Sequence, residues 1–241
     1  MSLFQNRYIY YPPKGQKFEA CPAFRTAEQV HVQGTRFYYK KHSDTLVVFY
    51  HGNAGSACDR AFLAGLFERL GLSYLFVEYT GYGGDGLRPS TGRLFADVVH
   101  VNEFLRPLDY KVLILAGESI GTGAAQYHTT LTRADKLLLV APFPTLARVA
   151  RRHFPFAIYP VSLLLQKDFD NPSWLSKFKG ELMIIHGSKD TVIPIALGRK
   201  LFDAASAARG EFVEIENAGH NDIYDNHTTE ERMEKFLRIE G

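Results

Sequence analysis

From Thr45 onward, short and almost continuous apolar runs alternate with longer segments of helical periodicity, and this alternation limits the fold more than any other feature. Strands that read as unbroken apolar runs are typical of a parallel sheet buried on both faces by helices. The runs expected to form such strands are Leu46–Tyr50, Tyr74–Tyr79, Val112–Ala116, Leu137–Val140, Leu182–His186 and Phe212–Ile215. The sequence therefore predicts an α/β fold with a doubly wound, mostly parallel central sheet and helices on both faces.

The segments between these runs carry helix start signals. Thr91 is an expected N-cap and Pro194 stands at an expected first turn. Thr228, with Glu231 three residues later, forms a capping box. The helices are expected at about residues 59–70, 92–105, 120–131, 194–208 and 228–239. Most of them connect successive strands, as a parallel sheet requires.

The first third of the chain has a different pattern, in which aromatic and β-branched runs are separated by turn residues. Arg7–Tyr11, Gln29–Val32 and Arg36–Lys41 are expected strands, and the first of them are expected to pair antiparallel. With 241 residues, 46% of them hydrophobic, the chain can bury about 70–75% of its unfolded surface in one core. No repeat or linker interrupts the sequence, so a single domain over residues 1–241 is expected.

Charge and hydropathy argue against two classes of partner. Lys and Arg number 28 against 26 Asp and Glu, without a basic block, so nucleic-acid binding is not expected. No stretch reaches the roughly 18–20 apolar residues of a membrane span. A soluble and cytoplasmic protein is expected, while a removed N-terminal signal or anchor stays open. Cys21 and Cys58 belong to no CxxC pair, and a disulfide between them stays open as well.

The most informative motif follows the expected strand Val112–Ala116. There the chain continues as Gly117-Glu-Ser119-Ile-Gly121, a G-x-S-x-G sequence that leads into a helix of small residues. This succession of strand, turn and helix is that of a nucleophile elbow, where the serine sits on a sharp turn. The residues two before and two after the serine approach closely, so Gly117 and Gly121 supply necessary room. Ser119 is therefore the candidate nucleophile.

A serine hydroxyl needs a base and a group that orients the base, and two residues stand where these are expected. Asp190 follows the expected strand Leu182–His186, and His220 follows Phe212–Ile215. Because parallel strands end at one edge of the sheet, both side chains would lie near Ser119, in the chain order serine, acid, histidine. We therefore assign Asp190 as the orienting acid and His220 as the general base.

Other acids and histidines compete with this assignment. Asp168, Asp170 and Asp222 could cap helices or lie in solvated turns, whereas the candidate acid follows a buried strand. His51 and His186 each stand before a glycine at a strand end, and they are expected to hydrogen-bond the backbone of their own turns. The candidate base alone has the required place in chain order.

The oxyanion of an acyl-transfer intermediate needs backbone donors. One is expected at the N–H of Ile120, directly after the nucleophile. The other is expected in the glycine-rich turn His51-Gly-Asn-Ala-Gly55, at the N–H of Asn53. Losing one such donor typically costs about 2.7–4 kcal/mol of transition-state stabilisation, so these positions matter as much as the side chains.

Two further patterns are not expected to bind ligands. Residues 220–227, which include Asp222, Asp225 and His227, offer ligand types for a metal, but no matching ligand motif stands elsewhere. Gly81–Gly86 fits G-x-G-x-x-G after a strand, yet Pro89 delays the next helix. A dinucleotide site opens its helix at the last glycine instead. No metal and no cofactor are therefore expected.

Taken in order along the chain, these motifs resemble the α/β-hydrolase superfamily, and more narrowly its Bem46-like serine hydrolases. The matching stretches are Phe4–Pro12, His51–Gly55, Glu78–Gly83, Gly117–Gly121, Ala141–Phe143, His186–Asp190 and Gly219–Asp222. The resemblance implies hydrolysis of esters or thioesters, and some relatives remove fatty acyl groups from protein cysteines. It also places a candidate short lid at residues 142–178, whose aromatic residues could wall an acyl pocket or simply complete the core, and the chain length leaves no room for a large cap domain.

The leading hypothesis is a cofactor-independent serine hydrolase that splits carboxylic esters or thioesters through an acyl-enzyme on Ser119. Its substrate would be a small-molecule or acyl-protein ester. A peptidase or amidase on the same fold is the alternative among enzymes, and a catalytically inert binding protein is the alternative outside them. The natural substrate, the acyl length and the oligomeric state stay open.

Overall fold

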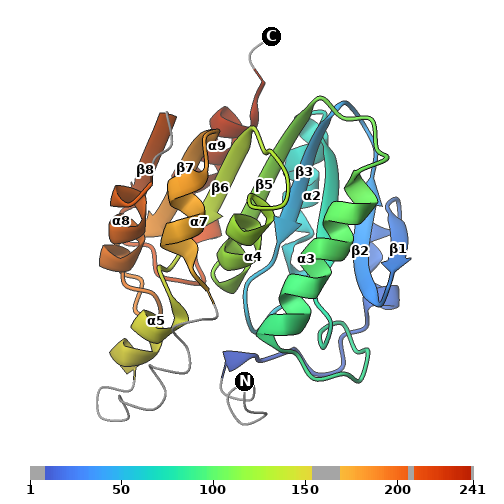
Figure 1. Cartoon of the computed structure of the whole chain (residues 1–241), viewed down its shortest axis with the longest axis horizontal. Helices are drawn as coiled ribbons and strands as arrows, with labels where there is room; N and C mark the ends of the chain where they lie inside the picture. Colours follow the sequence, from blue (N-terminus) through green and yellow to red (C-terminus); the bar gives the residue numbers. More distant parts are fainter. Residues whose placement is uncertain (1–8, 154–168, 206–208, 240–241) are drawn as a thin grey trace.

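An eight-stranded sheet runs through the part of the chain that the computed structural model describes, residues 9–153, 169–205 and 209–239 (Figure 1). Its strands lie in the order β1-β2-β4-β3-β5-β6-β7-β8. Their bounds are β1 Glu28–Val32, β2 Thr35–Lys40, β3 Thr45–Tyr50, β4 Ser73–Glu78, β5 Val112–Glu118, β6 Lys136–Val140, β7 Glu181–Gly187 and β8 Arg209–Ile215.

The pairing of these strands matches the two patterns in the sequence. β1 pairs antiparallel with β2, and β2 pairs antiparallel with β4. From β4 to β8 every neighbouring pair is parallel. The mostly parallel α/β sheet with antiparallel strands at its start is therefore confirmed. Because β3 to β8 run in one direction, the loops that follow β3, β5, β7 and β8 all emerge at the carboxyl edge of the sheet.

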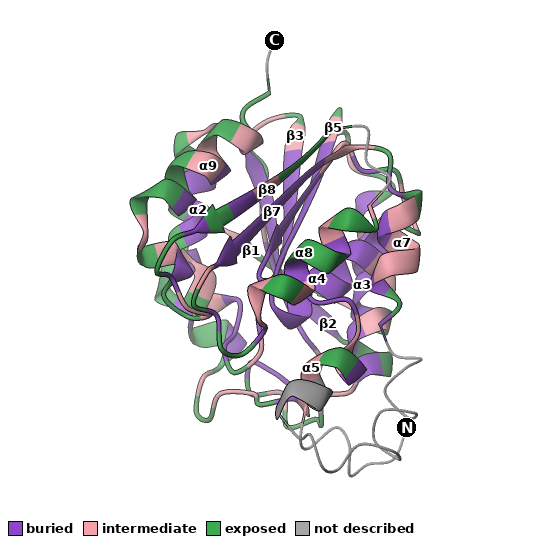
Figure 2. Cartoon of the chain, turned by 90° about the vertical axis from the view of Figure 1, so that its left-hand side faces the viewer, coloured by how far each residue is buried: buried purple, intermediate pink, exposed green. Residues whose placement is uncertain are grey.

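Helices cover both faces of the sheet (Figure 2). Their bounds are α2 Phe62–Arg69, α3 Thr91–Leu105, α4 Ile120–His128, α5 Leu146–His153, α7 Asn171–Lys177, α8 Ile195–Asp203 and α9 His227–Leu237. Short 3-10 helices lie at η1 Phe18–Ala20, η2 Pro22–Phe24, η3 Cys58–Arg60 and η4 Ile223–Asp225. None of the helices in the described ranges is long and apolar enough to cross a membrane.

Alternation along β5 shows how the two faces are buried. Leu113 and Leu115 pack into a cluster that holds the apolar residues of α3, α4, α7 and α8. Ile114 and Ala116 point to the other face, where α2 and α9 supply the covering side chains. Successive side chains of a strand point to opposite faces, so an unbroken apolar run serves two cores at once. This is why these strands lack a polar face in the sequence.

Several predicted boundaries are wrong for local reasons. Ser90, and not Thr91, caps α3, since its hydroxyl accepts the N–H of Arg93. The Thr91 hydroxyl instead meets the Tyr10 hydroxyl at 2.8 Å inside the fold. The capping box at Thr228 does not form, because α9 begins at His227. Its cap is an asparagine one residue earlier, whose side chain accepts the Thr228 N–H.

The helices also differ in length from the sequence pattern. The segment before α2 forms the 3-10 helix η3, so α2 starts only at Phe62. α4 ends at His128, three residues short of the predicted end, because the following threonines turn the chain. α8 ends at Asp203, and residues 206–208 of the prediction lie outside the described residues.

The described part of the predicted strand Arg7–Tyr11 does not join the sheet. Residues 7 and 8 lie outside the described residues, and Tyr10 and Tyr11 are in no strand. The N–H of Tyr11 donates to the Asn53 side-chain oxygen at 2.9 Å, and the Asn53 amide donates to the Ile9 carbonyl. The Asn53 side chain therefore bonds backbone groups of this segment that would pair with a neighbouring strand if the segment were a strand.

A disulfide joins Cys21 to Cys58, with Cα atoms 5.8 Å apart. It links the N-terminal segment that contains η1 and η2 to η3, across a sequence separation of 37 residues. The sequence left this pairing open. Since η3 follows the glycine-rich turn after β3, the disulfide fastens the N-terminal segment close to that turn.

The lid predicted at residues 142–178 is described only in part. α5 lies beyond the carboxyl ends of the strands, and α7 packs on α4 (Figure 1). Residues 154–168 lie outside the described residues. A lid formed by residues 142–178 stays a prediction.

Candidate active site

Ser119 stands alone between β5, which ends at Glu118, and α4, which begins at Ile120. Its backbone has φ 51° and ψ −119°, a region that side-chain-bearing residues rarely occupy. The Ser119 N–H donates to the Val140 carbonyl at 2.9 Å, which ties the turn to the neighbouring strand β6. The predicted sharp elbow is therefore present, and the sheet holds it in a strained conformation.

The two elbow glycines are required by close backbone approaches. A Cβ on Gly117 would clash with the carbonyl of Gly121, across the turn. A Cβ on Gly121 would clash with the carbonyl of Tyr50, the last residue of β3. The register pairs Tyr50 with Gly117, so the loop after β3 starts directly beside the elbow.

The structure brings the three predicted side chains into one hydrogen-bonded chain. The Nε2 atom of His220 lies 3.1 Å from the Oγ of Ser119, and its Nδ1 atom lies 2.7 Å from the Oδ2 of Asp190. A carboxylate only accepts, so Nδ1 carries the hydrogen and Nε2 accepts from the serine hydroxyl. The His220 side chain is 11% exposed and that of Asp190 is fully buried.

Asp190 is held as a carboxylate by donors on several sides. Its Oδ1 accepts the N–H groups of Val192 and Ile193 at 2.9 and 2.7 Å. Its Oδ2 accepts from His220, and the Nε2 of His186 lies 3.4 Å away. Burial raises the pKa of the Asp190 carboxyl, but its contacts with His186 and His220 and the N–H of Ile193 outweigh burial and hold its pKa well below the ordinary range.

The loops after β7 and β8 are packed against each other, which sets Asp190 and His220 side by side. The N–H of Lys189 donates to the Ala218 carbonyl at 2.9 Å. Asp222 closes the turn that carries His220, because its Oδ1 accepts the Gly219 N–H at 2.6 Å. Asp222, one of the competing acids, therefore shapes the loop and lies outside the hydrogen-bonded chain.

The other competing residues also have separate positions. Asp170 precedes α7 without a side-chain capping bond, and Asp168 lies outside the described residues. His51 Nδ1 lies 2.7 Å from the Gly52 carbonyl, and His186 Nε2 lies 2.7 Å from the Ile193 carbonyl. The prediction that both histidines bond the backbone of their own turns is confirmed.

The two predicted oxyanion donors lie at the start of α4 and in the turn after β3. Ile120 is the first residue of α4, and an N–H in this position has no acceptor within its own helix. Asn53 follows β3 in the turn that abuts the elbow, and Ala54 after it has φ 57°. The Asn53 side chain accepts from the Tyr82 hydroxyl at 2.7 Å in addition to its bonds with the N-terminal segment. Its side chain is thus held both by the N-terminal segment and by Tyr82.

A partly buried ion pair beside the elbow is absent from the sequence prediction. Glu118, the residue before the nucleophile, binds Arg60 through two contacts, Oε2 to Nε at 2.5 Å and Oε1 to Nη2 at 2.7 Å. A Cβ on Gly52 would lie 2.6 Å from the Glu118 Oε1 atom, so this carboxylate lies directly against the turn after β3. No signal in the sequence joins two residues so far apart.

The glycine-rich loop at residues 81–86, set aside in the sequence, has a structural role. The carboxylate of Asp85 accepts the N–H groups of Gly81 and Leu87, both at 2.8 Å, and so closes the glycine-rich loop on itself. α3 begins only at Thr91, well after the last glycine of that loop. Within residues 9–153, 169–205 and 209–239, no three or more His, Cys, Asp or Glu side chains gather as metal ligands.

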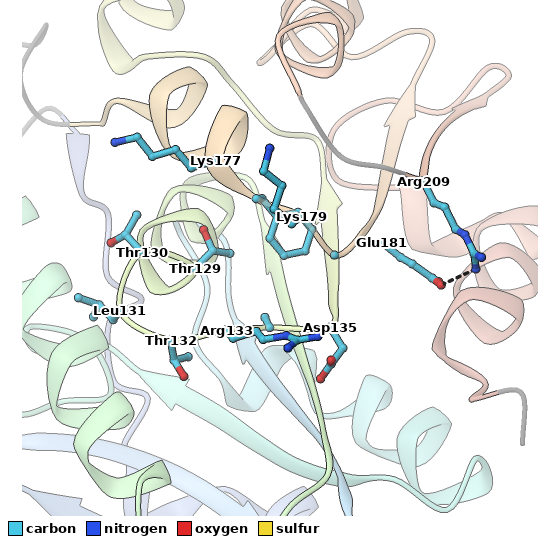
Figure 3. Close-up of a pocket in the computed structure, with 13 residues that line it drawn as sticks. Thr129, Thr130, Leu131, Thr132, Arg133, Asp135, Lys177, Lys179, Glu181 and Arg209 are labelled. Atoms are coloured by element: carbon cyan, nitrogen blue, oxygen red, sulfur yellow. Dashed lines mark hydrogen bonds and ion pairs between the residues drawn. The ribbon is translucent and has the colours of Figure 1, made fainter.

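A pocket of about 690 Å³ lies at the opposite, amino edge of the sheet (Figure 3). It is formed by the loop after α4 and by residues 177–181, and Arg209 at the start of β8 closes one side. Arg209 pairs with Glu181 at 3.3 Å. None of the three hydrogen-bonded residues of the carboxyl edge lines this pocket.

The chain is similar to proteins of about its own length and to longer ones. No family model matches the chain. An uncharacterised protein of Mycobacterium tuberculosis is 31% identical over 97% of this chain and 87% of its own length. A putative alpha/beta hydrolase of Acanthamoeba polyphaga mimivirus is 30% identical over 78% of this chain and 71% of its own length. The alpha/beta hydrolase domain-containing protein 17C of Xenopus tropicalis is 30% identical over 80% of this chain, which spans 62% of that relative.

Solved structures share the fold at low sequence identity. The Pyrococcus furiosus esterase Pf2001 superposes with a TM-score of 0.74 at 16% identity, over 94% of this chain and 98% of the esterase. Est1E from Butyrivibrio proteoclasticus has a TM-score of 0.72 at 16% identity, over 88% and 97% of the two chains.

Proposed function

Because the chain belongs to the α/β-hydrolase superfamily, as its ordered motifs predicted, we propose that it is a serine hydrolase acting through an acyl-enzyme on Ser119. The observation that carries the proposal is the hydrogen-bonded chain from Ser119 through His220 to Asp190. Its substrates are carboxylic esters or thioesters, either small molecules or acylated proteins. The esterase names of the structural neighbours support the same class of reaction.

In the first half of the reaction, His220 Nε2 takes the proton of the Ser119 hydroxyl as Oγ attacks the acyl carbon. The carbonyl oxygen becomes an oxyanion that accepts the N–H groups of Ile120 and Asn53. As the tetrahedral intermediate collapses, the protonated His220 gives the proton to the leaving alcohol or thiol. The acyl group stays on Ser119 as an ester.

In the second half, water replaces the leaving group. His220 takes a proton from the water, whose oxygen attacks the acyl carbon, and the same backbone donors hold the second oxyanion. Collapse returns the proton to the Ser119 oxygen and releases the carboxylic acid. All proton transfers use one imidazole, so the proposed cycle needs no cofactor.

Asp190 makes the histidine a competent base. Its carboxylate accepts the Nδ1 hydrogen of His220, which leaves Nε2 free to face Ser119. The same carboxylate stabilises the imidazolium that forms in each half-reaction. The depressed pKa of Asp190 supports this role, because the group is charged throughout the range in which an imidazole can act as a base.

Matched butyryl substrates test this function directly. Purified protein would be assayed with p-nitrophenyl butyrate, a butyryl thioester and a butyryl anilide, beside the Ser119→Ala variant. The proposal predicts ester and thioester turnover that the variant loses. Turnover of the anilide alone would favour a peptidase or amidase, and the absence of turnover with all three would favour an inert binding protein.

A further inference from the structure

A buried histidine and a buried glutamate lie beneath the turn that follows β3. His51 is the first residue after β3, and Glu78 is the last residue of the neighbouring strand β4. Each side chain is only 1% exposed, and neither takes part in the proton transfers proposed above. Buried charged groups are costly unless they are paired, so this pair calls for a structural or functional reason.

The two side chains hold the turn at both of its ends. The Nδ1 atom of His51 lies 2.7 Å from the carbonyl oxygen of Gly52. The Oε2 atom of Glu78 accepts the N–H of Ala57 at 3.2 Å. Between them, the Nε2 atom of His51 lies 3.5 Å from the Oε1 atom of Glu78. The pair therefore spans the turn from Gly52 to Ala57.

Hydrogen-bond chemistry assigns a hydrogen to Nδ1 of His51. The Gly52 carbonyl can only accept, so the imidazole must donate to it. The remaining nitrogen then faces Glu78, and neither His51 Nε2 nor Glu78 Oε1 has a hydrogen-bond partner elsewhere in the described part of the chain. These two atoms face each other at 3.5 Å, within ion-pair distance, and this contact leaves Nδ1 as the donor to the Gly52 carbonyl.

This donor fixes the direction of the next backbone N–H. The described chain holds no cis peptide bond. In a trans peptide unit the carbonyl and the N–H point in opposite directions. With the Gly52 carbonyl bound to the His51 ring, the Asn53 N–H must point away from that ring. A rotated peptide would turn the carbonyl dipole toward the oxyanion site, where it would repel negative charge.

Surrounding groups hold the imidazole in this orientation. The Tyr79 hydroxyl donates to the His51 carbonyl at 2.8 Å, and the Tyr79 ring lies 4.2 Å from the imidazole between centroids. The Tyr82 ring meets the imidazole edge-on at 5.3 Å. On its other side the turn lies against the carboxylate of Glu118, at Gly52. The ring therefore has little freedom to release the Gly52 carbonyl.

We infer that His51, held by Glu78, is a positioning residue that sets the direction of the Asn53 N–H in the oxyanion site. This inference rests on the proposed function, since an oxyanion site matters only if acyl transfer occurs. His51 touches no reacting atom. Its contribution is realised in the transition state, where the oxyanion forms, and is nearly absent in substrate binding.

Substitutions that keep or remove the Nδ1 donor test the inference. An asparagine side chain places its amide N–H near the position of Nδ1, whereas glutamine places it near Nε2 and leucine has no donor. With p-nitrophenyl butyrate, His51→Leu and His51→Gln should lower kcat by about 10²–10³-fold with KM within about twofold. His51→Asn should recover kcat to within about tenfold of the wild type.

A transition-state analogue supplies a readout that a structural role alone would not move. A trifluoromethyl ketone with a butyl chain adds to the serine and leaves an oxyanion in the same site. Its inhibition constant should rise by about 10²–10³-fold in His51→Gln and by less than about tenfold in His51→Asn. Thermal unfolding verifies each fold, and His227→Leu, at an exposed histidine, serves as the control.

The outcomes separate this inference from the proposed function. Wild-type turnover with equal activities of His51→Asn and His51→Gln would overturn the inference alone, and so would a change in KM without a change in kcat. If His51→Leu does not fold, the comparison of asparagine with glutamine still decides. A wild-type protein that cleaves neither ester nor thioester would overturn the proposed function, and the inference with it.

Discussion

The two edges of the sheet hold polar residues in different ways. At the carboxyl edge, Ser119, His220 and Asp190 come from three separate loops and bond to one another. At the amino edge, where the 690 Å³ pocket lies, several polar side chains bond the backbone at the end or start of an element. The Thr129 and Thr130 hydroxyls each donate to a carbonyl of α4 at 2.7 Å.

The charged residues of the amino edge follow the same pattern. Asp135 accepts the N–H of Leu113 at 2.9 Å, and Glu181 pairs with Lys136 and Arg209. The amino-edge pocket is thus lined by Asp135, Glu181 and Arg209 side chains that already have partners within the fold. At the carboxyl edge, the backbone of Ser119 is strained, and the buried carboxylate of Asp190 is bonded to His220. Strain and convergent hydrogen bonds, and not the volume of a hollow, therefore identify the candidate site.

Exchanging His220 for alanine should produce the largest difference between the edges. Without a base, kcat for p-nitrophenyl butyrate should fall by about 10⁴–10⁶-fold, because the oxyanion donors and binding leave only a residual rate. The matched change at the amino edge, Lys179→Ala, should leave kcat/KM within about twofold of the wild type. Steady-state kinetics on both folded variants would measure this. Equal effects of the two substitutions would abolish the distinction between the edges.

Asp190→Asn should have the next largest effect. The amide can donate to His220 Nδ1 and so stabilise the wrong tautomer, which should lower kcat by about 10²–10⁴-fold. In the wild type the pKa of Asp190 is held well below its ordinary range, so a pH profile of kcat/KM should show no ionisation of this carboxyl between pH 4 and pH 9. Asp44→Asn, at an exposed ion pair, is the control. A variant with more than a tenth of wild-type kcat would remove Asp190 from the proposed mechanism.

The carboxyl edge also depends on a covalent link. The Cys21–Cys58 disulfide spans 37 residues, and a loop of that length should contribute about 4 kcal/mol to the free energy of unfolding through the entropy of the unfolded chain. Denaturant titration of the Cys21→Ser, Cys58→Ser double variant should show this loss, and reduction of the wild type should reproduce it. A difference below about 1 kcal/mol would mean that the link does not stabilise this region.

The smallest predicted effect concerns the far end of α4, where His128 lies next to the pocket loop. Burial lowers the pKa of His128 to about 3, while its Nδ1 stays bonded to the Tyr50 hydroxyl at 2.8 Å. A histidine whose folded pKa lies below its unfolded value stabilises the fold above about pH 6.5 and loses that stability as the pH falls. Acidification from pH 7 to pH 5 should therefore cost about 2 kcal/mol.

Denaturant titrations of wild type and His128→Asn at both pH values measure this effect. Asparagine keeps a polar group near the Tyr50 hydroxyl without titrating. The variant should lose about 2 kcal/mol less than the wild type between pH 7 and pH 5. Equal pH dependence in the two proteins would show that His128 is not the group that titrates.

The alternation of apolar runs and helical segments was sufficient to predict the sheet. A strand that is buried on both faces needs apolar side chains on both, so its sequence is a continuous apolar run. Ser119, Asp190 and His220 could be predicted for a related reason, since each follows a buried strand and parallel strands end at one edge. Chain order alone then excluded most of the other histidines. These parts of the prediction depend on local pattern and on topology.

Other features of the site depend on contacts between distant residues, which local pattern does not encode. Arg60 pairs with Glu118 across 58 positions, and Asn53 holds the Tyr11 backbone across 42. Threonine is a residue type that often caps helices, yet the Thr91 hydroxyl bonds Tyr10, and the preceding serine caps the helix. Serine and threonine are chemically equivalent as caps, and only the folded arrangement decides between them.

Covalent labelling tests most directly whether the convergent geometry activates Ser119. Folded protein would be incubated with a fluorophosphonate, which reacts only with an activated serine, and its intact mass and peptide map would be measured. We predict one adduct, on Ser119, that is absent from Ser119→Ala and strongly slowed in His220→Ala. An adduct on another residue, or no adduct on a folded wild-type protein, would contradict the account.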